Sequence, residues 1–276
     1  MTSDPAKLIL RAHREGVTTL TMNMPARLNG WTLEMMMALR EAFRRAAEDE
    51  DTRAVIITGT DPYYSAGVNL SGTVKLQHPR ALRELIREQN QALFDLFIGF
   101  PKPLLAAVNG PAIGASVTSA TLCDGLIASD KATFSTPFAR LDVPHEGCSS
   151  EMFPKLLGEE TAERILGREG WVPTGTEAQE IGLAQWVVPH AELLDEAQRI
   201  AEGWAAERTG RAYRGGFTRE QLEAINAAES ERVADAFLSA PFLRGQYRFL
   251  WKKNKRVPAA IFFALCHSRP LWSRLL

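Results

Sequence analysis

Two short apolar runs, each closed by glycine, constrain the fold of this chain more than any other feature. Residues 54–59 and 104–110 are largely apolar stretches, typical of strands buried on both faces of a sheet. Between them, apolar residues at positions 82–97 follow helical spacing until Pro101 and Pro103 prevent the helix from continuing. The order strand, helix, strand predicts a right-handed crossover, and therefore a parallel sheet covered by helices.

The flanking segments extend this α/β pattern. Residues 8–10 and 17–23 flank Glu15-Gly16 and predict an opening hairpin. A helix is expected from Thr32, and it should end before the acidic residues 48–51 because the helix dipole disfavours negative charge at a C-terminus. The remaining predicted elements are a helix over 114–123, strands over 125–128 and 133–135, and helices over 192–208 and 218–237. We expect the sheet to end with the last of these strands.

The composition excludes several classes of protein. At 276 residues the chain can form one large domain, alone or with a small appendage. Its 32 Lys and Arg residues nearly cancel its 33 Asp and Glu residues, so no global field attracts nucleic acid or an anionic membrane. The apolar runs are too short to span a bilayer. The three cysteines, Cys123, Cys148 and Cys266, lie far apart and fit neither a disulfide framework nor a zinc site. We therefore expect no metal, no nucleic-acid partner and no membrane span.

The same cysteine pattern predicts a reducing compartment, and we expect a cytoplasmic protein. Residues 1–5 contain no basic segment followed by an apolar one, so no secretion signal is expected there. The last residues, 273–276, differ from the Ser-Lys-Leu peroxisomal signal.

Two glycine-containing turns follow the two best strands, at residues 65–70 and 109–116. In an open α/β sheet, ligands gather at the carboxyl ends of strands, where loops present unpaired backbone N–H groups. The second turn leads into a helix start, which adds a partial positive charge. The N–H of Ala115 could therefore stabilise an oxyanion, and the N–H of Ala66 could converge on it from the first turn. Taken alone, both segments also fit ordinary strand-to-helix turns.

Other glycine motifs and a nucleophilic serine are less well supported. Neither turn has the G-x-G-x-x-G or G-x-x-x-x-G-K-[ST] pattern of nucleotide sites. Residues 114–118 lack the closing glycine of a nucleophile elbow. Asp142, His145 and Ser149 could form a triad but crowd into one short segment. A serine hydrolase stays open as an alternative of a different class.

Three spaced motifs together resemble a known family. They are MPARLN at 24–29, SAGVNL at 65–70 and AVNGPAIGA at 107–115, and the match continues through 174–188. The chain resembles the enoyl-CoA hydratase/isomerase (crotonase) superfamily over roughly residues 8–200. The resemblance implies an α/β spiral of repeated ββα units and an α-helical C-terminal part that mediates trimer formation. It also implies a CoA thioester as substrate, held at an oxyanion hole of two backbone N–H groups.

Carried onto this sequence, the resemblance assigns the oxyanion hole to Ala66 and Ala115. Ala115 stands where glycine is common in the family, and its methyl group could narrow the acyl pocket. Arg27 is a candidate for the CoA phosphates, although an ordinary exposed arginine fits it equally well. Coenzyme A is part of the substrate, so we expect no separate cofactor. The residues expected to bind the substrate or CoA are Arg27, Leu28, Ser65, Ala66, Gly67, Val68, Asn69, Leu70, Gly114, Ala115 and Phe138.

The resemblance also suggests how the chain is organised. We expect a spiral core with the CoA and catalytic site at 1–195, and a helical C-terminal region at 196–276. From Gln246 onwards this region extends past the expected end of the family match. A homotrimer or a dimer of trimers is expected. Five apolar tail residues should then be buried in the assembly or against the acyl pocket: Phe249, Trp251, Ile261, Phe262 and Phe263.

The reaction depends on which acids are present. Family hydratases use two glutamates, and these positions align with Thr118 and Phe138, neither of which can transfer the required proton. Water addition is therefore not expected. The segment 132–150, especially Glu146-Gly147-Cys148-Ser149-Ser150, resembles the Δ3,Δ2-enoyl-CoA isomerase branch. In that branch the glutamate of this motif is the catalytic base, which implies Glu146 here.

The implied function is an isomerase of fatty acid metabolism that converts a 3-enoyl-CoA to a 2-enoyl-CoA. Glu146 would remove a proton from C2 and return it at C4, while Ala66 and Ala115 hold the enolate oxygen. Apolar surroundings such as Phe138 and Val143 would raise the pKa of the Glu146 carboxyl and make it a better base. The alternatives are another crotonase-type acyl-CoA enzyme (a hydratase, hydrolase or lyase) or a CoA-ester binder without activity.

Overall fold

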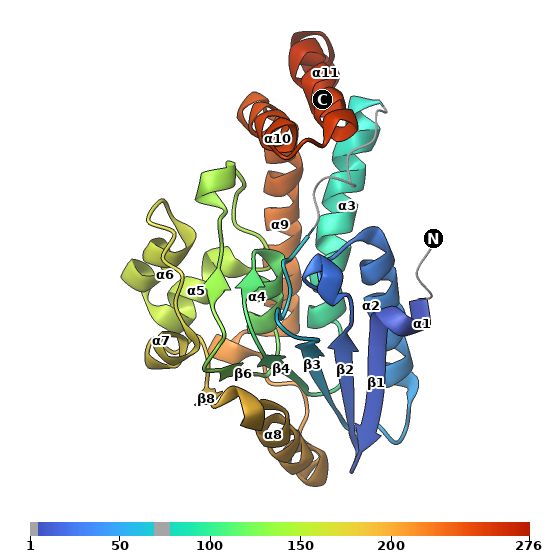
Figure 1. Ribbon diagram of the computed structural model, residues 1–276, viewed down its shortest axis with the longest axis vertical. Helices are drawn as coiled ribbons and strands as arrows, with labels where there is room; N and C mark the ends of the chain where they lie inside the picture. Colours follow the sequence, from blue (N-terminus) through green and yellow to red (C-terminus); the bar gives the residue numbers. More distant parts are fainter. Residues whose placement is uncertain (1–4, 69–77) are drawn as a thin grey trace.

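The computed structural model describes residues 5–68 and 78–276 and is built around a six-stranded sheet (Figure 1). The strand order is β1-β2-β3-β4-β6-β8, with β1 antiparallel to β2 and all later neighbours parallel. A second sheet pairs β5 with β7 in parallel. The strands are β1 (Ile9–Arg14), β2 (Val17–Met22), β3 (Ala54–Gly59), β4 (Leu104–Val108), β5 (Ala112–Ile113), β6 (Gly125–Ser129), β7 (Phe134–Ser135) and β8 (Trp186–Val188). This arrangement confirms the predicted α/β spiral.

Helices cover both faces of the main sheet and continue beyond it. In Figure 1, α8 lies along one face while α2 to α4 lie on the other side. The α-helices are α1 (Pro5–Leu8), α2 (Leu33–Glu48), α3 (Pro79–Ile98), α4 (Ala115–Thr121), α5 (Ser149–Leu157), α6 (Glu159–Leu166), α7 (Gly175–Glu180), α8 (Leu193–Glu207), α9 (Arg219–Phe237), α10 (Ala240–Lys252) and α11 (Arg256–Trp272). Short 3-10 turns include η1 (Pro25–Arg27) and η3 (Ala139–Leu141).

The burial of strand β3 on both faces of the sheet explains why its sequence is almost entirely apolar. Val55 and Ile57 belong to the core on one face, whereas Ile56 packs on the other face in a cluster with Leu193 and Ala197 of α8. All six residues of the strand are buried. A strand covered on both faces needs apolar residues at every position rather than at alternate ones.

The predicted elements agree with the structure except at the end of the sheet and at the end of α2, which was expected before residue 48. The opening hairpin is confirmed, and α2 ends at Glu48, one residue into the acidic cluster, with Thr32 as its N-cap. The expectation that the sheet ends near residue 135 is wrong, because Trp186–Val188 adds β8 beside β6. This strand is only three half-buried residues long, so it has too few positions to show a hydrophobic period.

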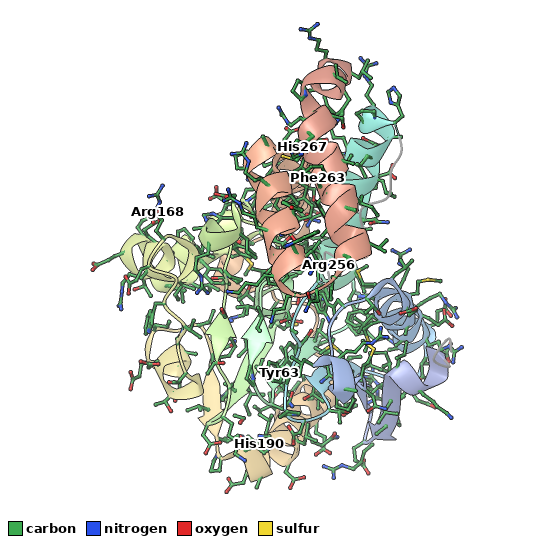
Figure 2. All side chains as sticks on the ribbon, turned by 45° about the horizontal axis from the view of Figure 1, so that its top comes forward. Tyr63, Arg168, His190, Arg256, Phe263 and His267 are labelled. Carbon is green, nitrogen blue, oxygen red and sulfur yellow. The ribbon has the colours of Figure 1, made fainter. Side chains whose placement is uncertain are left out.

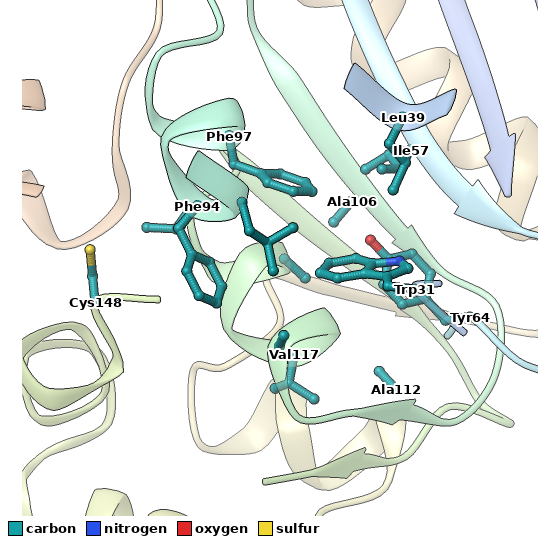
Figure 3. Packing of buried hydrophobic residues seen from close by; sticks show 14 of the residues in the cluster. Trp31, Leu39, Ile57, Tyr64, Phe94, Phe97, Ala106, Ala112, Val117 and Cys148 are labelled. Carbon is teal, nitrogen blue, oxygen red and sulfur yellow. The ribbon is translucent and has the colours of Figure 1, made fainter. Parts of the chain in front are cut away.

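The core reaches the first glycine turn through Trp31. Its fully buried ring stacks on Phe97 at 6.1 Å between centroids, and Figure 3 shows both rings in the same buried cluster as Tyr64 and Val117. Its backbone N–H donates to the carbonyl of Gly67 at 2.8 Å. The segment near residue 30 therefore holds the turn near residue 67 in place.

The C-terminal helices α10 and α11 form a hairpin that projects from the body, with Arg256 at its turn and Phe263 along α11 (Figure 2). Phe262 is buried, and its ring meets that of Phe242 at 6.4 Å. Phe249, Trp251 and Phe263 are 52%, 49% and 44% exposed on the single chain. Ile261 is half-buried. Burial of the exposed residues in an assembly stays a prediction, as does the division at residue 195.

The length and composition of the helices also bear on membranes. Across the two described segments, every helix is too short or too polar to cross a bilayer.

Candidate active site

The two glycine turns lie against each other. The N–H of Ile113 donates to the carbonyl of Ser65 at 3.0 Å, and the hydroxyl of Ser116 donates to the same carbonyl at 3.0 Å. Gly67 has φ +72°, and a Cβ there would lie 2.2 Å from the carbonyl oxygen of Ile113. Glycine is therefore required at position 67, because only its bare Cα permits this approach.

The N-terminal motif supports the first turn from beneath. The side-chain amide of Asn29 is fully buried and donates to the carbonyls of Thr60 and Tyr63, both at 2.7 Å. The hydroxyl of Ser65 donates to the carbonyl of Asn29 at 2.8 Å. These bonds explain why MPARLN and SAGVNL, far apart in the sequence, occur together.

The same contacts correct one predicted role. The N–H of Ala66 donates to the carbonyl of Leu28 at 2.9 Å, so it is committed to the fold and is not free to hold an oxyanion. The N–H of Val68, two residues later, has no acceptor within the described part of the chain, and the same is true of Ala115 at the start of α4. The available pair of donors is therefore Val68 and Ala115.

A cavity of about 160 Å³ opens in front of the turns. Its walls include Ala66, Val68, Gly114, Ala115 and Phe138 from the predicted set. Apolar side chains from α2, α3, β5, α9 and the segment after β7 complete it: Met36, Ile86, Leu93, Ile113, Pro137, Leu141, Val143, Val233 and Phe237. Such walls suit an acyl chain and exclude water. Asn69 and Leu70 lie outside the described residues.

Glu146 is the single ionisable side chain on the described wall of this cavity, beside the amides Gln89 and Asn90. It is only 8% exposed, and its Oε2 accepts a hydrogen bond of 2.8 Å from the amide of Asn90. Burial raises the pKa of Glu146 to about 7; the Asn90 bond opposes this shift and the nearby charge of Glu229 adds to it. The side chain is therefore partly ionised near neutral pH, which suits a general base.

Thr118 and Phe138, which occupy the positions of the hydratase glutamates, cannot transfer a proton. Thr118 is fully buried, and its hydroxyl donates to the carbonyl of Ala115 at 3.3 Å. A Cβ at position 147 would lie 2.6 Å from that hydroxyl oxygen, so Thr118 and Gly147 are in close contact. Phe138 lines the cavity as an apolar wall.

The serine-hydrolase arrangement does not form. The hydroxyl of Ser149 donates to the backbone carbonyl of Glu146 at 2.8 Å, and in the described residues no hydrogen bond joins it to His145 or Asp142. His145 lines a different hollow, together with Arg232.

Another serine and histidine meet elsewhere in the fold. The Oγ of Ser129 lies 3.1 Å from Nδ1 of His190, whose Nε2 lies 3.0 Å from a carboxylate oxygen of Asp61. Ser129 is completely buried, so its hydroxyl cannot meet a substrate. This set ties the loop after β3 to the end of β6.

A groove continues from the cavity towards the tail. It shares Ala66, Val68 and Leu141 with the cavity, and Arg27, Leu28 and Gly67 lie in its wall. The tail supplies the far wall, with Gln246, Phe249, Leu250 and Lys255. Arg27 and Lys255 are the cations on the described wall. The sequence analysis named Arg27 as a candidate for the CoA phosphates but missed Lys255.

Of the other predicted binding residues, Ser65 lies behind the wall. It is fully buried, and its Oγ accepts a hydrogen bond of 3.1 Å from the N–H of Gly67. Ser65 therefore shapes the turn rather than meeting a ligand. In the described segments, no three His, Cys, Asp or Glu side chains lie close enough together to hold a metal ion.

A spiral α/β fold with two facing N–H turns and one buried carboxylate defines a crotonase-type site. Comparison with known proteins agrees on the family: the chain belongs to the enoyl-CoA hydratase/isomerase family, whose model matches residues 12–256. The match continues through Gln246 to residue 256, so the expectation that the chain extends past the family match from Gln246 is wrong.

Several proteins of this family are similar to the chain. Human enoyl-CoA delta isomerase 2 is 34% identical over 249 residues, covering 87% of this chain and 62% of that protein, so the chain spans less than two thirds of its length. Mouse peroxisomal enoyl-CoA delta isomerase 3 is 30% identical over 258 residues, covering 91% and 80%. An enoyl-CoA hydratase/isomerase structure from Pseudoalteromonas atlantica T6c superimposes with a TM-score of 0.72 at 27% identity, covering 89% and 98%. Because the mouse protein is peroxisomal by name, a cytoplasmic location for this chain stays a prediction.

Proposed function

We propose that the chain is a Δ3,Δ2-enoyl-CoA isomerase with Glu146 as its single general base. The observation that carries the proposal is one buried carboxyl with a pKa of about 7, in an apolar cavity that also contains two free N–H donors. The names of the human and mouse relatives, both enoyl-CoA delta isomerases, support it.

The chemistry needs only one carboxylate. The C2 proton of a 3-enoyl thioester is acidic because the carbanion spreads over the carbonyl and the alkene. Glu146 takes this proton, and the C2–H electron pair forms the C1–C2 double bond of a dienolate whose negative charge lies on the thioester oxygen. When the carbonyl re-forms, the C2–C3 bond becomes double and the electron pair of the former alkene accepts a proton at C4. The protonated Glu146 then delivers the same proton to C4. No oxidant, metal or water is consumed.

The N–H groups of Val68 and Ala115 would hold the enolate oxygen between these two steps. Each donor aimed at a developing oxyanion contributes roughly 3–4 kcal/mol in other enzymes. The methyl group of Ala115 lies at the cavity wall and leaves its N–H available.

Hydration is disfavoured on the same grounds. Adding water to a 2-enoyl thioester requires a group that activates water and another that protonates the carbon. Thr118 is buried behind the wall, and Phe138 cannot ionise. A hydrolase or lyase reaction has no second ionisable side chain on the described cavity wall to support it. CoA-ester binding without turnover would leave Glu146 without a role.

The substrate would enter along the groove. Its thioester would lie between the turns, its acyl chain in the apolar cavity, and its CoA phosphates near Arg27 and Lys255. A homotrimer, or a dimer of trimers, would give the exposed rings of Phe249, Trp251 and Phe263 a partner surface.

A spectrophotometric assay with panels of 3-enoyl-CoAs and 2-enoyl-CoAs tests the proposal. Wild-type protein should isomerise 3-enoyl-CoAs, and Glu146→Gln should lose at least about 10²-fold in kcat while still binding CoA esters. Glu151→Gln is the matched control, because Glu151 is an exposed acid five residues away. Retention of activity within about tenfold in the Glu146→Gln variant would overturn the assignment.

A further inference from the structure

The turn that carries Glu146 has an unfavourable backbone. Gly147 and Cys148 follow it with φ +66° and +63°. Glycine adopts this conformation freely, but a residue with a Cβ does not. A Cβ at position 147 would also lie 2.5 Å from the ring of Phe94, so the turn is tightly enclosed. A turn of this kind persists when contacts from elsewhere hold it.

Two of those contacts come from one buried carboxylate, that of Glu229 on α9. It is completely buried, its Oε2 accepts the N–H of Cys148 at 2.6 Å, and its Oε1 accepts the N–H of Ser150 at 2.9 Å. Both N–H groups belong to the start of α5, where the helix leaves donors unsatisfied and favours negative charge. The reaction described above does not use Glu229.

The next residue on α9, Ser230, supports the side chain of Glu146 through Asn90. The hydroxyl of Ser230 donates to Oδ1 of Asn90 at 2.9 Å, and Asn90 in turn donates to Glu146. Glu229 therefore holds the backbone of the turn, while Ser230 orients the amide that holds the side chain. Two consecutive residues of one helix thus support Glu146, one through the backbone of its turn and the other through Asn90.

We propose that Glu229 is a positioning residue for the general base: its carboxylate fixes the 146–150 turn through the N–H groups of Cys148 and Ser150, and its charge acts on Glu146. The inference rests on the proposed function, because it assigns Glu229 a role through Glu146. It does not make Glu229 a catalytic residue, since Glu229 does not line the described wall of the cavity.

The charges around Glu229 are few. Burial raises its pKa, while the hydrogen bonds from Ser150 and Cys148 and the charge of Arg232 favour its anion. Asp95 of α3 and Glu229 both act on the buried thiol of Cys148, whose pKa is raised mainly by burial. Among these groups, Glu229 is the one whose charge acts on Glu146 and raises its pKa. Removing that charge should make Glu146 easier to ionise.

The experiment compares Glu229→Gln with Glu231→Gln. Glu231 lies two residues further along α9, is half-buried, and pairs with Arg83, so its variant controls for loss of an acid on this helix. For each, kcat, KM and the pH dependence of kcat/KM are measured with a 3-enoyl-CoA. We expect Glu229→Gln to lower the apparent pKa and to reduce kcat more than it changes KM. Glu231→Gln should change neither.

Two further measurements keep the test decisive. Infrared titration of the Glu146 carboxyl, assigned by its loss in Glu146→Gln, reports the same pKa without requiring activity, so it separates this inference from the proposed function. Glu229→Asp retains the charge but shortens the reach, so it should lower kcat and leave the pKa of Glu146 near that of wild type. It also serves if Glu229→Gln does not fold. Superimposable titrations of Glu229→Gln and wild type, or a wild-type kcat in Glu229→Asp, would overturn the proposal.

Discussion

Asn90 of α3 donates its side-chain amide to Oε2 of Glu146 at 2.8 Å, and the other carboxyl oxygen, Oε1, has no partner among the described residues. One oxygen is thus fixed by the protein while the other stays available to a substrate proton. Because Asn90 donates to the charged form, its bond offsets part of the cost of burial. The pKa of the Glu146 carboxyl therefore lies near neutral pH.

The first prediction concerns pH. A base must be ionised to act, so kcat/KM should rise about tenfold per pH unit below the pKa of about 7 and become constant above it. Asn90→Ala removes a bond to the anion, so its profile should shift to higher pH, with much of the rate recovered at alkaline pH. A profile that stayed in place, or moved to lower pH, would contradict this role of Asn90.

The second prediction concerns stability. The pKa of Glu146 is raised from 4.5 to about 7 in the folded protein, so between these values the unfolded chain ionises while the folded one keeps its proton. Stability contributed by this group is therefore lost as pH rises from about 4.5 to 7, by up to about 3 kcal/mol. Glu146→Gln should match wild type near pH 4.5 and be more stable than it above pH 7. Urea denaturation at both pH values measures the difference, with Glu151→Gln as control.

The third prediction excludes hydration. Wild-type protein should form at most traces of 3-hydroxyacyl-CoA from 2-enoyl-CoA, which chromatography of the products would detect. Thr118→Glu should not restore hydration, because position 118 is buried against Gly147 and leaves no room for a longer acid. Rapid hydration by either protein would mean that another group activates water.

The spacing of apolar residues along the sequence predicted most of the helices and strands. The α8 and α9 helices, Leu193–Glu207 and Arg219–Phe237, match the predicted ranges within a residue, because long helices repeat their apolar spacing over several turns. Two residues from local motifs, Glu146 and Ala115, lie on the wall of one cavity, and their catalytic roles stay predictions.

The missed features depend on contacts between distant segments. Whether Ala66 or Val68 offers a free N–H depends on a hydrogen bond to Leu28, which the turn motif does not contain. Asn90 and Glu229 are polar residues on amphipathic helices, where they look like surface positions until the helices pack. The one available signal was that Asn226, Glu229 and Ser230, at helical spacing, form a polar group within the α9 face that is buried.

The fourth prediction tests the groove. Lys255 and the nearby Lys253 are both exposed, but only Lys255 lines the described groove. Lys255→Ala should raise KM for a CoA ester about fivefold at low salt, the size of an exposed charge contact of roughly 1 kcal/mol, and leave kcat unchanged. Lys253→Ala should change KM less, and added salt should reduce the difference. If both variants raised KM equally, the lysines of the tail would attract the anionic CoA ester only through their general charge, and Lys255 would make no specific contact.

The last prediction uses neighbouring aromatic residues of α11. Phe262 is 2% exposed and packs against Phe242, so Phe262→Ala should leave a cavity and lower the free energy of unfolding by about 3–5 kcal/mol. Phe263 is 44% exposed, so Phe263→Ala should cost far less within the single chain. If the hairpin is an assembly surface, however, Phe263→Ala should weaken the trimer, and light scattering over a dilution series would then show smaller species than wild type. An unchanged molar mass at every concentration would remove Phe263 from any interface and leave the hairpin as a wall of the groove alone.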